Sequence, residues 1–211
     1  MMDLPKEFNL SIEMRKLYLS KDYYVPISRS RALSDDNYWS DNIDPDGNKR
    51  NRIDEKDEYL SNISEELNYI NKIKPGKILD IGCGLGWLLS AVQGDWEKYG
   101  VEISKYASGH ATEHANIDNN DFLNVQYNAN FFDLIIMHHV IEHMQNPVEN
   151  LEKALKILKD DGIIIIATPD FDSGCARRFG NNYRLLHDST HMSLFSNDSM
   201  HRMLRDHLLE I

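Results

Sequence analysis

The amino-acid sequence predicts an α/β fold in which a doubly wound, mainly parallel sheet carries helices on both faces. Residues 131–137 are a continuous apolar run with one acid, as expected of a strand that is buried on both faces, and residues 163–169 read as a strand of β-branched residues. Segments with helical periodicity alternate with the predicted strands, and this alternation is typical of parallel sheets. A glycine-rich loop at residues 82–86 joins one such strand to a helix.

Length and composition limit the classes of protein to which the chain can belong. The chain has 211 residues, of which 41% are hydrophobic, enough for one sizeable core. Its formal net charge of -11 would repel a polyanion, so we expect no nucleic-acid partner. Two cysteines argue against a disulfide framework. No apolar run approaches the ~18 residues of a membrane helix, and the first residues lack the order of a signal peptide. We therefore expect a cytoplasmic protein with no membrane partner.

Residues 1–58 are predicted to form an N-terminal region with a short helix and a polar, lid-like segment. Ile12, Leu17 and Leu19 have weak helical spacing. Residues 34–58 are nearly all polar, with a turn signal at 44–47. Two interpretations stay open for this polar stretch: a solvated, mobile segment, or a lid that orders over a bound ligand. Residues 59–211 are predicted to form the ligand-binding domain.

The elements of that domain follow from periodicity and turn signals. Apolar residues recur at three- and four-residue steps over 59–73, and Lys74–Gly76 ends this predicted helix. A later helix is predicted to end at 159–162, where Gly162 follows three charged residues. The other predicted strands are 77–81, 96–102, a short strand ending at 119–122, 131–137 and 163–169; the other predicted helices are 87–92, 104–115, 148–158 and 197–207.

The glycine loop predicts a bound ligand with a ribose. Gly82, Gly84 and Gly86 lack a Cβ, so they can adopt positive φ and let a ligand approach the backbone. A dinucleotide fingerprint would place two residues before its third glycine, whereas only one precedes Gly86. Glu102 follows Gly82 by 20 residues, at the end of the second predicted strand. A carboxylate at that position can accept hydrogen bonds from two ribose hydroxyls.

These residues carry a resemblance to a known superfamily. The stretch from Asp80 to Gly86 resembles motif I of the class I S-adenosylmethionine-dependent methyltransferases, and residues 131–137 resemble motif IV. Residues 140–147, 162–170 and 182–196 are similar to the branch that contains ubiquinone-biosynthesis-type and sugar-modifying small-molecule methyltransferases. The matches cover residues ~60 to 211. They imply a Rossmann-like fold and S-adenosyl-L-methionine as the cofactor.

The resemblance also implies a function. We expect methyl transfer to an oxygen or nitrogen of a small acceptor, and we favour a sugar or a phosphorylated precursor in surface-polysaccharide biosynthesis. A NAD-linked Rossmann oxidoreductase and a catalytically silent cofactor-binding module remain as alternatives. A homodimer is one possible assembly.

The cofactor site is expected at the carboxyl ends of the strands. By resemblance, Asp121 and Phe122 would lie against the adenine, the alternative being a turn Asp and a core Phe. For Cys83 the alternative is a small residue that fills the loop. The full set of expected cofactor-binding residues is Asp80, Gly82, Cys83, Gly84, Gly86, Trp87, Glu102, Ile103, Asp121, Phe122 and His138.

A hydroxyl acceptor needs a base, and histidine has a pKa that suits the task. The candidates are His138, His143 and His191, each with a structural hydrogen bond as the alternative role. Candidate acceptor-binding residues are Tyr24, Arg184 and His187, because guanidinium can bind phosphate or carboxylate with two hydrogen bonds.

The same residue types could form a metal site. Glu142, His143, His187 and His191 could supply oxygen and imidazole ligands. Glu142 and His143 are adjacent and are expected to point in different directions on a helix, so we expect no metal.

The C-terminal end departs from the superfamily pattern. Members usually follow the helix predicted at 197–207 with a sixth strand and an antiparallel seventh, whereas Leu208–Ile211 offers only the start of the sixth. We therefore expect the last strands to be truncated and one sheet edge to be open.

Overall fold

The computed structural model describes residues 10–20, 22–27, 37–40, 42–43, 49–188 and 190–207. The chain divides into two compact units. Unit 1 comprises Met1–Ala32, His139–Pro147 and Ala167–Ile211, and unit 2 comprises Leu33–His138 and Val148–Ile166. The predicted N-terminal region 1–58 contributes to both units, and its separate role stays a prediction. The predicted start of a sixth strand at 208–211 lies outside the described residues.

The sheet of unit 2 has five strands in the order β6-β5-β4-β7-β8. The strands are β4 (Lys77–Ile81), β5 (Glu97–Val101), β6 (Asn116–Asp118), β7 (Phe132–His138) and β8 (Leu158–Ala167). Strand β4 pairs in parallel with both β5 and β7, and β5 pairs in parallel with β6. The chain runs outward from β4 to β6 and then returns to β7, so β4 and β7 flank a topological switch point. The predicted mainly parallel sheet is confirmed.

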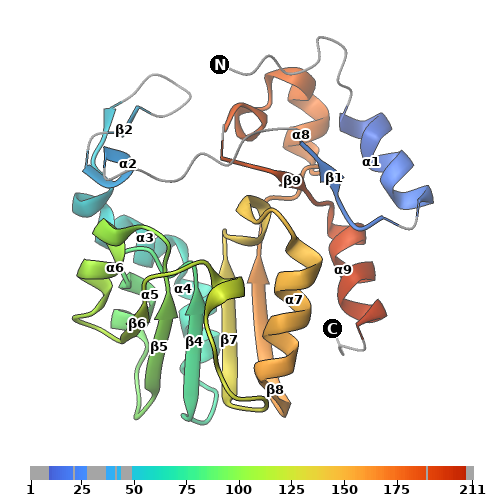
Figure 1. Ribbon diagram of the computed structural model, residues 1–211. Helices are drawn as coiled ribbons and strands as arrows, with labels where there is room; N and C mark the ends of the chain where they lie inside the picture. The colour runs from blue at the N-terminus through green and yellow to red at the C-terminus, as the bar shows by residue number, and fades with distance from the viewer. Residues whose placement is uncertain are drawn as a thin grey trace. The chain divides into compact units, whose positions relative to one another are not determined.

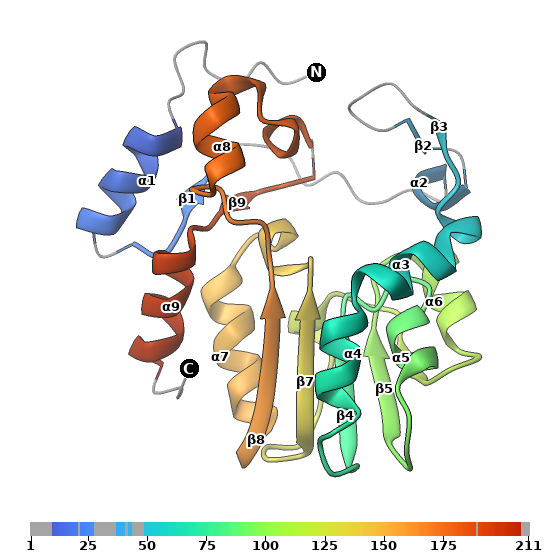
Figure 2. The ribbon, with the colours of Figure 1, turned by 180° about the vertical axis from the view of Figure 1, so that it is seen from behind.

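Helices cover both faces of this sheet. Figure 1 shows α7 (Pro147–Ile157) in front of β8, and Figure 2 shows α4 (Ser64–Ile70) and α5 (Trp87–Ala91) on the opposite face. The sheet is therefore wound on both sides, as predicted. The remaining elements of unit 2 are α2 (Asn37–Ser40), the antiparallel pair β2 (Asn42–Ile43) and β3 (Lys49–Arg50), η1 (Arg52–Glu55), α3 (Lys56–Asn62), α6 (Lys105–Ala111) and η2 (Phe122–Asn124).

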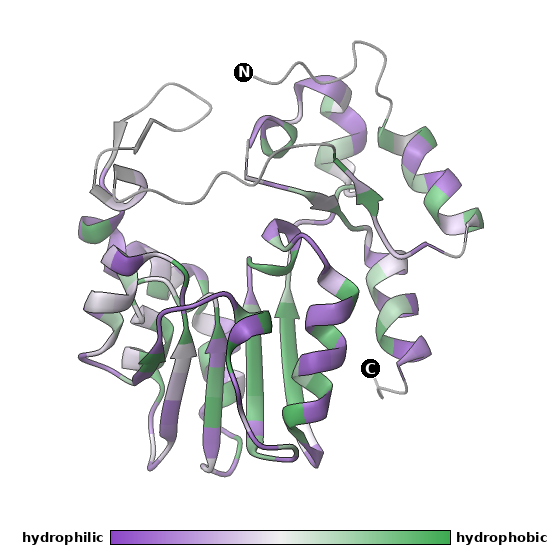
Figure 3. Ribbon diagram, in the orientation of Figure 1, coloured by the Kyte–Doolittle hydropathy of each residue, from purple (hydrophilic) through white to green (hydrophobic). Residues whose placement is uncertain are grey.

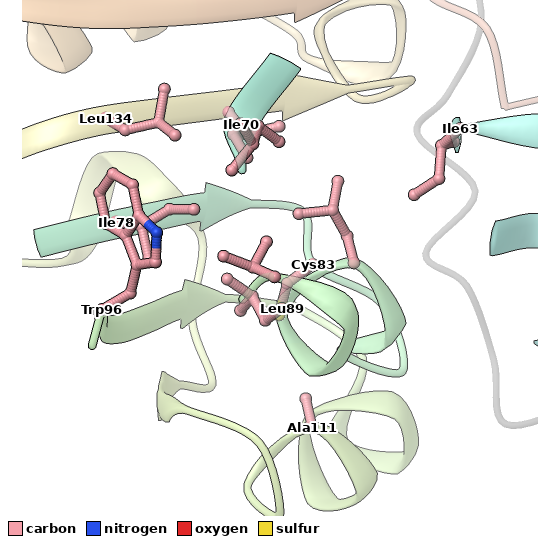
Figure 4. Close-up of a cluster of buried hydrophobic side chains, with 11 residues drawn as sticks. Ile63, Ile70, Ile78, Cys83, Leu89, Trp96, Ala111 and Leu134 are labelled. Atoms are coloured by element: carbon pink, nitrogen blue, oxygen red, sulfur yellow. The ribbon is translucent and has the colours of Figure 1, made fainter. Parts of the chain in front are cut away.

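The single helix predicted at 59–73 is wrong, because two short helices, α3 and α4, meet at Ile63. Ile63 has φ −103° and ψ 19°, outside helical geometry, and its side chain is buried. It joins a core cluster with Ile70, Ile78, Leu89 and Trp96 (Figure 4). The apolar periodicity continued across the break, so periodicity could not reveal it.

The central strands are buried on both faces, as their composition predicts. Successive β7 residues Leu134, Ile135, Ile136 and Met137 are all buried, so both sides of the strand face apolar groups. Figure 3 shows hydrophobic colouring along most of β7 and β8.

Strand β8 begins earlier than predicted. The sequence predicts a helix end at 159–162, but helix α7 stops at Ile157 and β8 starts at Leu158. The Lys159 ammonium lies 2.6 Å from one carboxylate oxygen of Asp133, and the other oxygen accepts the Lys77 N–H at 2.7 Å. This ion pair offers the charged segment a partner at the start of the sheet, which a reading of local turn residues could not anticipate.

Unit 1 has its own core beneath a small antiparallel pair, β1 (Val25–Pro26) and β9 (Ser193–Leu194). Its core is the cluster of Leu10, Met14, Leu17, Phe171, Ala176, Leu186 and Leu194. Its helices are α1 (Leu10–Leu19), η3 (Ile141–His143), α8 (Gly174–Phe179), η4 (Gly180–Asn182), η5 (Arg184–His187) and α9 (Asn197–Asp206). None of the helices in the described part of the chain is long and apolar enough to span a membrane.

The N-terminal helix exists, but its predicted apolar face is wrong. Leu17 is buried, whereas Ile12 is 50% exposed and Leu19 is 84% exposed. The buried residues are Leu10, Met14 and Leu17, which follow the four- and three-residue steps of one helix face.

We expect Met14→Ala to destabilise unit 1, because it leaves a cavity among Phe171 and Leu194. Removing a buried Met side chain costs about 2–5 kcal/mol. The matched control, Ile12→Ala on the exposed side of the same helix, should change the free energy of unfolding by about 0.5 kcal/mol or less. Urea unfolding followed by circular dichroism measures both; equal losses would contradict the assignment of the buried face.

Candidate functional site

The glycine loop between β4 and α5 has the backbone that its glycines predict. Gly82, Gly84 and Gly86 have φ values of +74°, +54° and +76°, in the left-handed region that side chains disfavour. The N–H groups of Gly82 and Cys83 both donate to the carbonyl oxygen of Val101, at 2.7 and 3.2 Å. The loop is therefore tied to the end of β5.

Glu102, directly after β5, holds the loop from the other side. One carboxylate oxygen accepts the Gly84 N–H at 3.0 Å, and the other accepts the Ser104 N–H at 2.7 Å. The side chain is buried, with 7% exposure. Each carboxylate oxygen can accept more than one hydrogen bond, so a carboxylate fixed in this way can also accept from the hydroxyls of a ribose.

Two neighbouring groups are kept protonated by burial. Burial, and then the negative charge of Glu102, raises the pKa of Asp80 to about 8. Burial also raises the pKa of the Cys83 thiol. Cys83 belongs to the hydrophobic core, and a Cβ on Gly100 would lie 2.7 Å from its sulfur. Its packing fits the interpretation of a small residue that fills the loop.

Trp39 covers the glycine loop, a role that the sequence alone did not reveal. A Cβ built on Gly84 would lie 2.9 Å from the Trp39 ring, and the indole N–H donates to the Ser104 hydroxyl at 3.1 Å. Tyr38 packs edge-on against Trp39, and the Arg52 guanidinium lies 4.4 Å from the centre of the Tyr38 ring. The available signal was a pair of adjacent aromatic residues within an otherwise polar stretch.

A second aromatic group gathers at the ends of β4 and β7. The Tyr59 ring lies 5.6 Å from the Trp87 ring and 6.1 Å from His138, measured between centroids. Burial, and then the charge of Asp80, raises the pKa of the Tyr59 hydroxyl. Two predicted cofactor-binding residues, Trp87 and His138, are thus brought to one place.

The predicted adenine-binding residues have structural partners. Asp121 caps η2 by accepting the Leu123 N–H at 3.0 Å. Phe122 is buried, and its carbonyl oxygen accepts from the Lys153 ammonium at 2.6 Å. Ile103 is exposed at the turn after Glu102. The adenine contacts stay a prediction.

In unit 1, a buried carboxylate gathers histidines from distant parts of the chain. Glu142 is 1% exposed, and one of its oxygens accepts the Thr168 hydroxyl at 3.0 Å. Its other oxygen lies 3.3 Å from Nδ1 of His139 and 3.9 Å from Nε2 of His143. His143 and His191 have ring centroids 4.8 Å apart. The expectation that Glu142 and His143 point in different directions is wrong, because both side chains reach the same place from the 3-10 helix η3, with Nε2 of His143 3.9 Å from the carboxylate.

The hydrogen bonds of these rings define their tautomers. Nδ1 of His143 lies 3.1 Å from the carbonyl oxygen of Thr190, and Nδ1 of His191 lies 2.9 Å from that of Leu185. A carbonyl only accepts, so each Nδ1 carries the hydrogen. In the neutral rings, both Nε2 atoms then have a lone pair.

The pKa values of His191 and Glu142 both shift downward, for different physical reasons. Burial lowers the pKa of His191, and the charge of His143 lowers it further. Burial acts to raise the pKa of Glu142, but the hydrogen bond from His139 and the charges of His143 and His139 outweigh it, so the net shift is downward. The cluster thus combines an ionised carboxylate with a neutral imidazole.

The three predicted acceptor-binding residues all lie in unit 1. Tyr24 is half-buried against Phe195, with ring centroids 5.6 Å apart. Arg184 and His187 lie on η5 and are exposed, and Nε2 of His187 lies 2.9 Å from the carbonyl oxygen of Asn181. Their roles stay predictions.

Comparison with known families decides the class of protein. Residues 50–211 match the family model described as "Methyltransferase domain". The chain belongs to this family. Its curated relatives include a ubiquinone biosynthesis O-methyltransferase from Glaesserella parasuis, 31% identical over 122 residues, which are 48% of this chain and 50% of the relative. An ajmaline N-methyltransferase from Rauvolfia serpentina is 32% identical over 104 residues, 44% of this chain and 36% of the relative. The matches therefore span half or less of each relative's length.

Solved structures share the fold. An S-adenosylmethionine-dependent methyltransferase from Archaeoglobus fulgidus has a TM-score of 0.62 at 18% identity, covering 72% of this methyltransferase-family chain and 67% of its own. The plantazolicin methyltransferase BpumL, in a complex with S-adenosylhomocysteine (SAH), has a TM-score of 0.58 at 25% identity. The match covers 73% of this chain and 67% of BpumL. These likenesses confirm the Rossmann-like fold class, and both of these neighbours are named as proteins that use or hold S-adenosylmethionine or SAH.

The glycine loop and the carboxylate after β5 have the chemistry needed to hold S-adenosylmethionine. Glu102 supplies a carboxylate for the ribose, and Gly84 keeps the loop backbone bare where any Cβ would meet Trp39. When bound, the cofactor supplies an activated methyl group on a sulfonium. The protein's own contribution at this site is to bind and orient it.

We expect Glu102→Ala and Gly84→Val each to weaken SAH binding at least about tenfold, since hydrogen bonds to a charged group contribute about 1.5–3 kcal/mol. The first change releases the loop N–H, and the second forces a side chain onto positive φ and against Trp39. Glu97→Ala, at the opposite end of β5, is the matched control and should bind normally. Calorimetric titration measures all three. Undiminished SAH binding in both variants would contradict the assignment of Glu102 and Gly84 to the cofactor site.

We expect Asp80→Asn to change how stability depends on pH. Folded Asp80 keeps its proton up to about pH 8, whereas in the unfolded chain the carboxyl ionises near pH 4. Between these values the folded state binds more protons, so this group makes the fold less stable as pH rises. The variant should therefore gain stability relative to the parent between about pH 5 and about pH 8. Urea unfolding at both pH values measures the difference in stability between the variant and the parent. The same difference at both pH values would contradict the raised pKa of Asp80.

Asp133→Asn is the control of opposite sign. Burial acts to raise the pKa of Asp133, but hydrogen bonds from Lys159 and from the Lys77 N–H lower it overall. The stability that this carboxylate provides is present above its unfolded pKa of about 4 and is lost only as pH falls below that value. This variant should therefore lose the same amount of stability at about pH 5 and about pH 8.

Proposed function

We propose that this protein transfers a methyl group from S-adenosylmethionine to an oxygen or nitrogen of a small acceptor. The observation that carries the proposal is the Glu102 carboxylate, bound to the backbone of both the positive-φ loop and the start of α6, in a chain of the methyltransferase family. The two curated relatives are named for O-methylation and N-methylation, which supports both kinds of acceptor atom.

A histidine would remove the acceptor proton when the acceptor is a hydroxyl. His138 lies beside Tyr59 in unit 2, while His143 and His191 present Nε2 lone pairs in unit 1. As the oxygen forms its bond to the methyl carbon and the carbon–sulfur bond breaks, its proton passes to one of these nitrogens. An amine acceptor would lose its proton after transfer.

A sugar or phosphorylated glycan precursor is the acceptor class that we favour. Arg184 and His187 are exposed on one short helix of unit 1, and a guanidinium binds phosphate with two hydrogen bonds. Tyr24 would supply an aromatic surface for a sugar ring. A cytoplasmic location and a homodimeric assembly belong to the same proposal.

The activity is tested by incubating the full chain with S-adenosylmethionine labelled in the methyl group and a small-molecule extract. We expect a labelled product that is absent with Glu102→Ala. Purified sugar phosphates, sugar nucleotides and quinols then identify the acceptor class. Tight SAH binding without any labelled product would favour a catalytically silent cofactor-binding module instead.

Substitution of the candidate bases gives a second test. We expect loss of the base to slow transfer about 10²–10⁴-fold. His138→Ala, His143→Ala and His191→Ala are therefore compared in the labelled-donor assay, with SAH affinity measured in parallel. A variant that loses transfer but keeps its SAH affinity identifies a group that acts on the acceptor, and unchanged transfer in all three would contradict a histidine base.

A further inference from the structure

Three metal-ligating atoms converge in unit 1 from two distant segments. A carboxylate oxygen of Glu142 and one ring nitrogen each of His143 and His191 lie within 4.8 Å of one another. Glu142 and His191 are buried, with 1% and 4% exposure, and His143 is partly exposed. The cluster therefore has a closed side and an approachable side.

The polarity of these atoms is the main argument for a cation between them. Because Nδ1 of each imidazole donates to a backbone carbonyl, Nε2 of each neutral ring is an acceptor. The Glu142 oxygen 3.9 Å from Nε2 of His143 is also an acceptor. The Nδ1 atom of His139 faces this Glu142 oxygen from one side at 3.3 Å. The oxygen and the two Nε2 lone pairs still repel one another unless a proton or a metal ion lies between them.

A metal ion relieves the repulsion among these three acceptor atoms more completely than a proton does. A proton on one ring nitrogen donates along a single N–H direction, so it does not satisfy the other two acceptor atoms equally. A single metal ion would bind the carboxylate and both lone pairs at once. Asp188, whose oxygen lies 3.9 Å from Nε2 of His191, adds a second negative charge beside the cluster.

The groups behind the ligands already hold them in binding orientation. The carbonyl oxygens of Thr190 and Leu185 fix the tautomers of His143 and His191, and the Thr168 hydroxyl orients the Glu142 carboxylate. Such outer contacts are characteristic of metal-binding histidines and carboxylates. His139, which follows β7 and lies beside the carboxylate, has a φ of +51°, an uncommon conformation for a residue with a side chain.

We propose that unit 1 binds one divalent transition-metal ion through the Glu142 carboxylate and the Nε2 atoms of His143 and His191. Ligand distances of about 2.1 Å in a tetrahedral site place the ligand atoms about 3.4 Å apart, so small side-chain rotations close the observed spacing. Two imidazoles and one carboxylate favour zinc, manganese, iron or cobalt over calcium or magnesium. Three protein ligands leave at least one position for water or a ligand oxygen.

The metal would replace two of the candidate bases. With Nε2 bound to the ion, His143 and His191 no longer accept a proton, and the ion itself lowers the pKa of a hydroxyl bound in its open position. That proton passes to solvent. Metal binding itself is measured without donor or acceptor, so it can fail or succeed independently of the proposed methyl transfer.

The test uses Co²⁺, whose visible absorption reports its ligands, added to the full chain after chelator treatment. We expect one Co²⁺ per chain and a stabilised fold in thermal unfolding. Outer-shell changes weaken metal sites about 10–100-fold, so loss of a direct ligand in His143→Gln or His191→Gln should weaken Co²⁺ binding at least about a hundredfold. His187→Gln, an exposed histidine of the same segment, is the matched control and should bind as the parent does.

Thr168→Val provides a variant that leaves all three ligands in place. Losing the hydroxyl that orients Glu142 should weaken Co²⁺ binding about tenfold. Co²⁺ that binds without fixed stoichiometry, or equally well in the His143→Gln, His191→Gln double variant, would overturn the proposal. So would absence of Co²⁺ binding in a parent chain that binds SAH normally, which would leave a proton shared within the cluster.

Discussion

The hydrogen bonds of the Glu102 carboxylate are the interactions on which the cofactor site depends. They join the end of β5, the loop after β4 and the start of α6. A buried carboxylate is costly unless its charge is satisfied, and two backbone N–H groups satisfy it here. The same requirement explains why the loop must be glycine: only a backbone at positive φ, without a Cβ, presents its N–H to Glu102 beneath Trp39.

A second buried carboxylate organises unit 1 by similar physics. Glu142 accepts from the Thr168 hydroxyl and faces the imidazoles of His139 and His143, while His191 is held nearby through Leu185. Its environment differs from that of Glu102, because imidazole rings rather than only backbone N–H groups surround it. Rings of this kind can move protons or bind metal, whereas the Glu102 contacts are fixed. Glu102 is thus held rigidly by backbone groups, whereas Glu142 lies among groups that can exchange protons or bind metal.

Much of the fold could be predicted because it rests on local patterns. The apolar run of β7 and the glycine spacing each show their structure within a few residues. The errors arose where distant contacts decided the outcome. Ile63 interrupts a helix to enter the core, the Asp133–Lys159 pair accompanies the early start of β8, and α1 turns Leu10 and Met14 inward instead of Ile12 and Leu19. The role of Trp39 was equally invisible, since its partners Gly84 and Ser104 are far away in sequence.

The sequence by itself determined the alternation of strands and helices, the conformation of the glycine loop and the acid at the end of β5, because spacing and backbone sterics act over short distances. Only the tertiary structure decided which histidines meet. His143 and His191 are separated in the chain by strand β8 and by the helical segments α7, α8, η4 and η5. Their tautomers depend on carbonyl groups of Thr190 and Leu185 that no periodicity reveals. Ligand sets of this kind are assembled by packing, so their geometry emerges when the chain is folded.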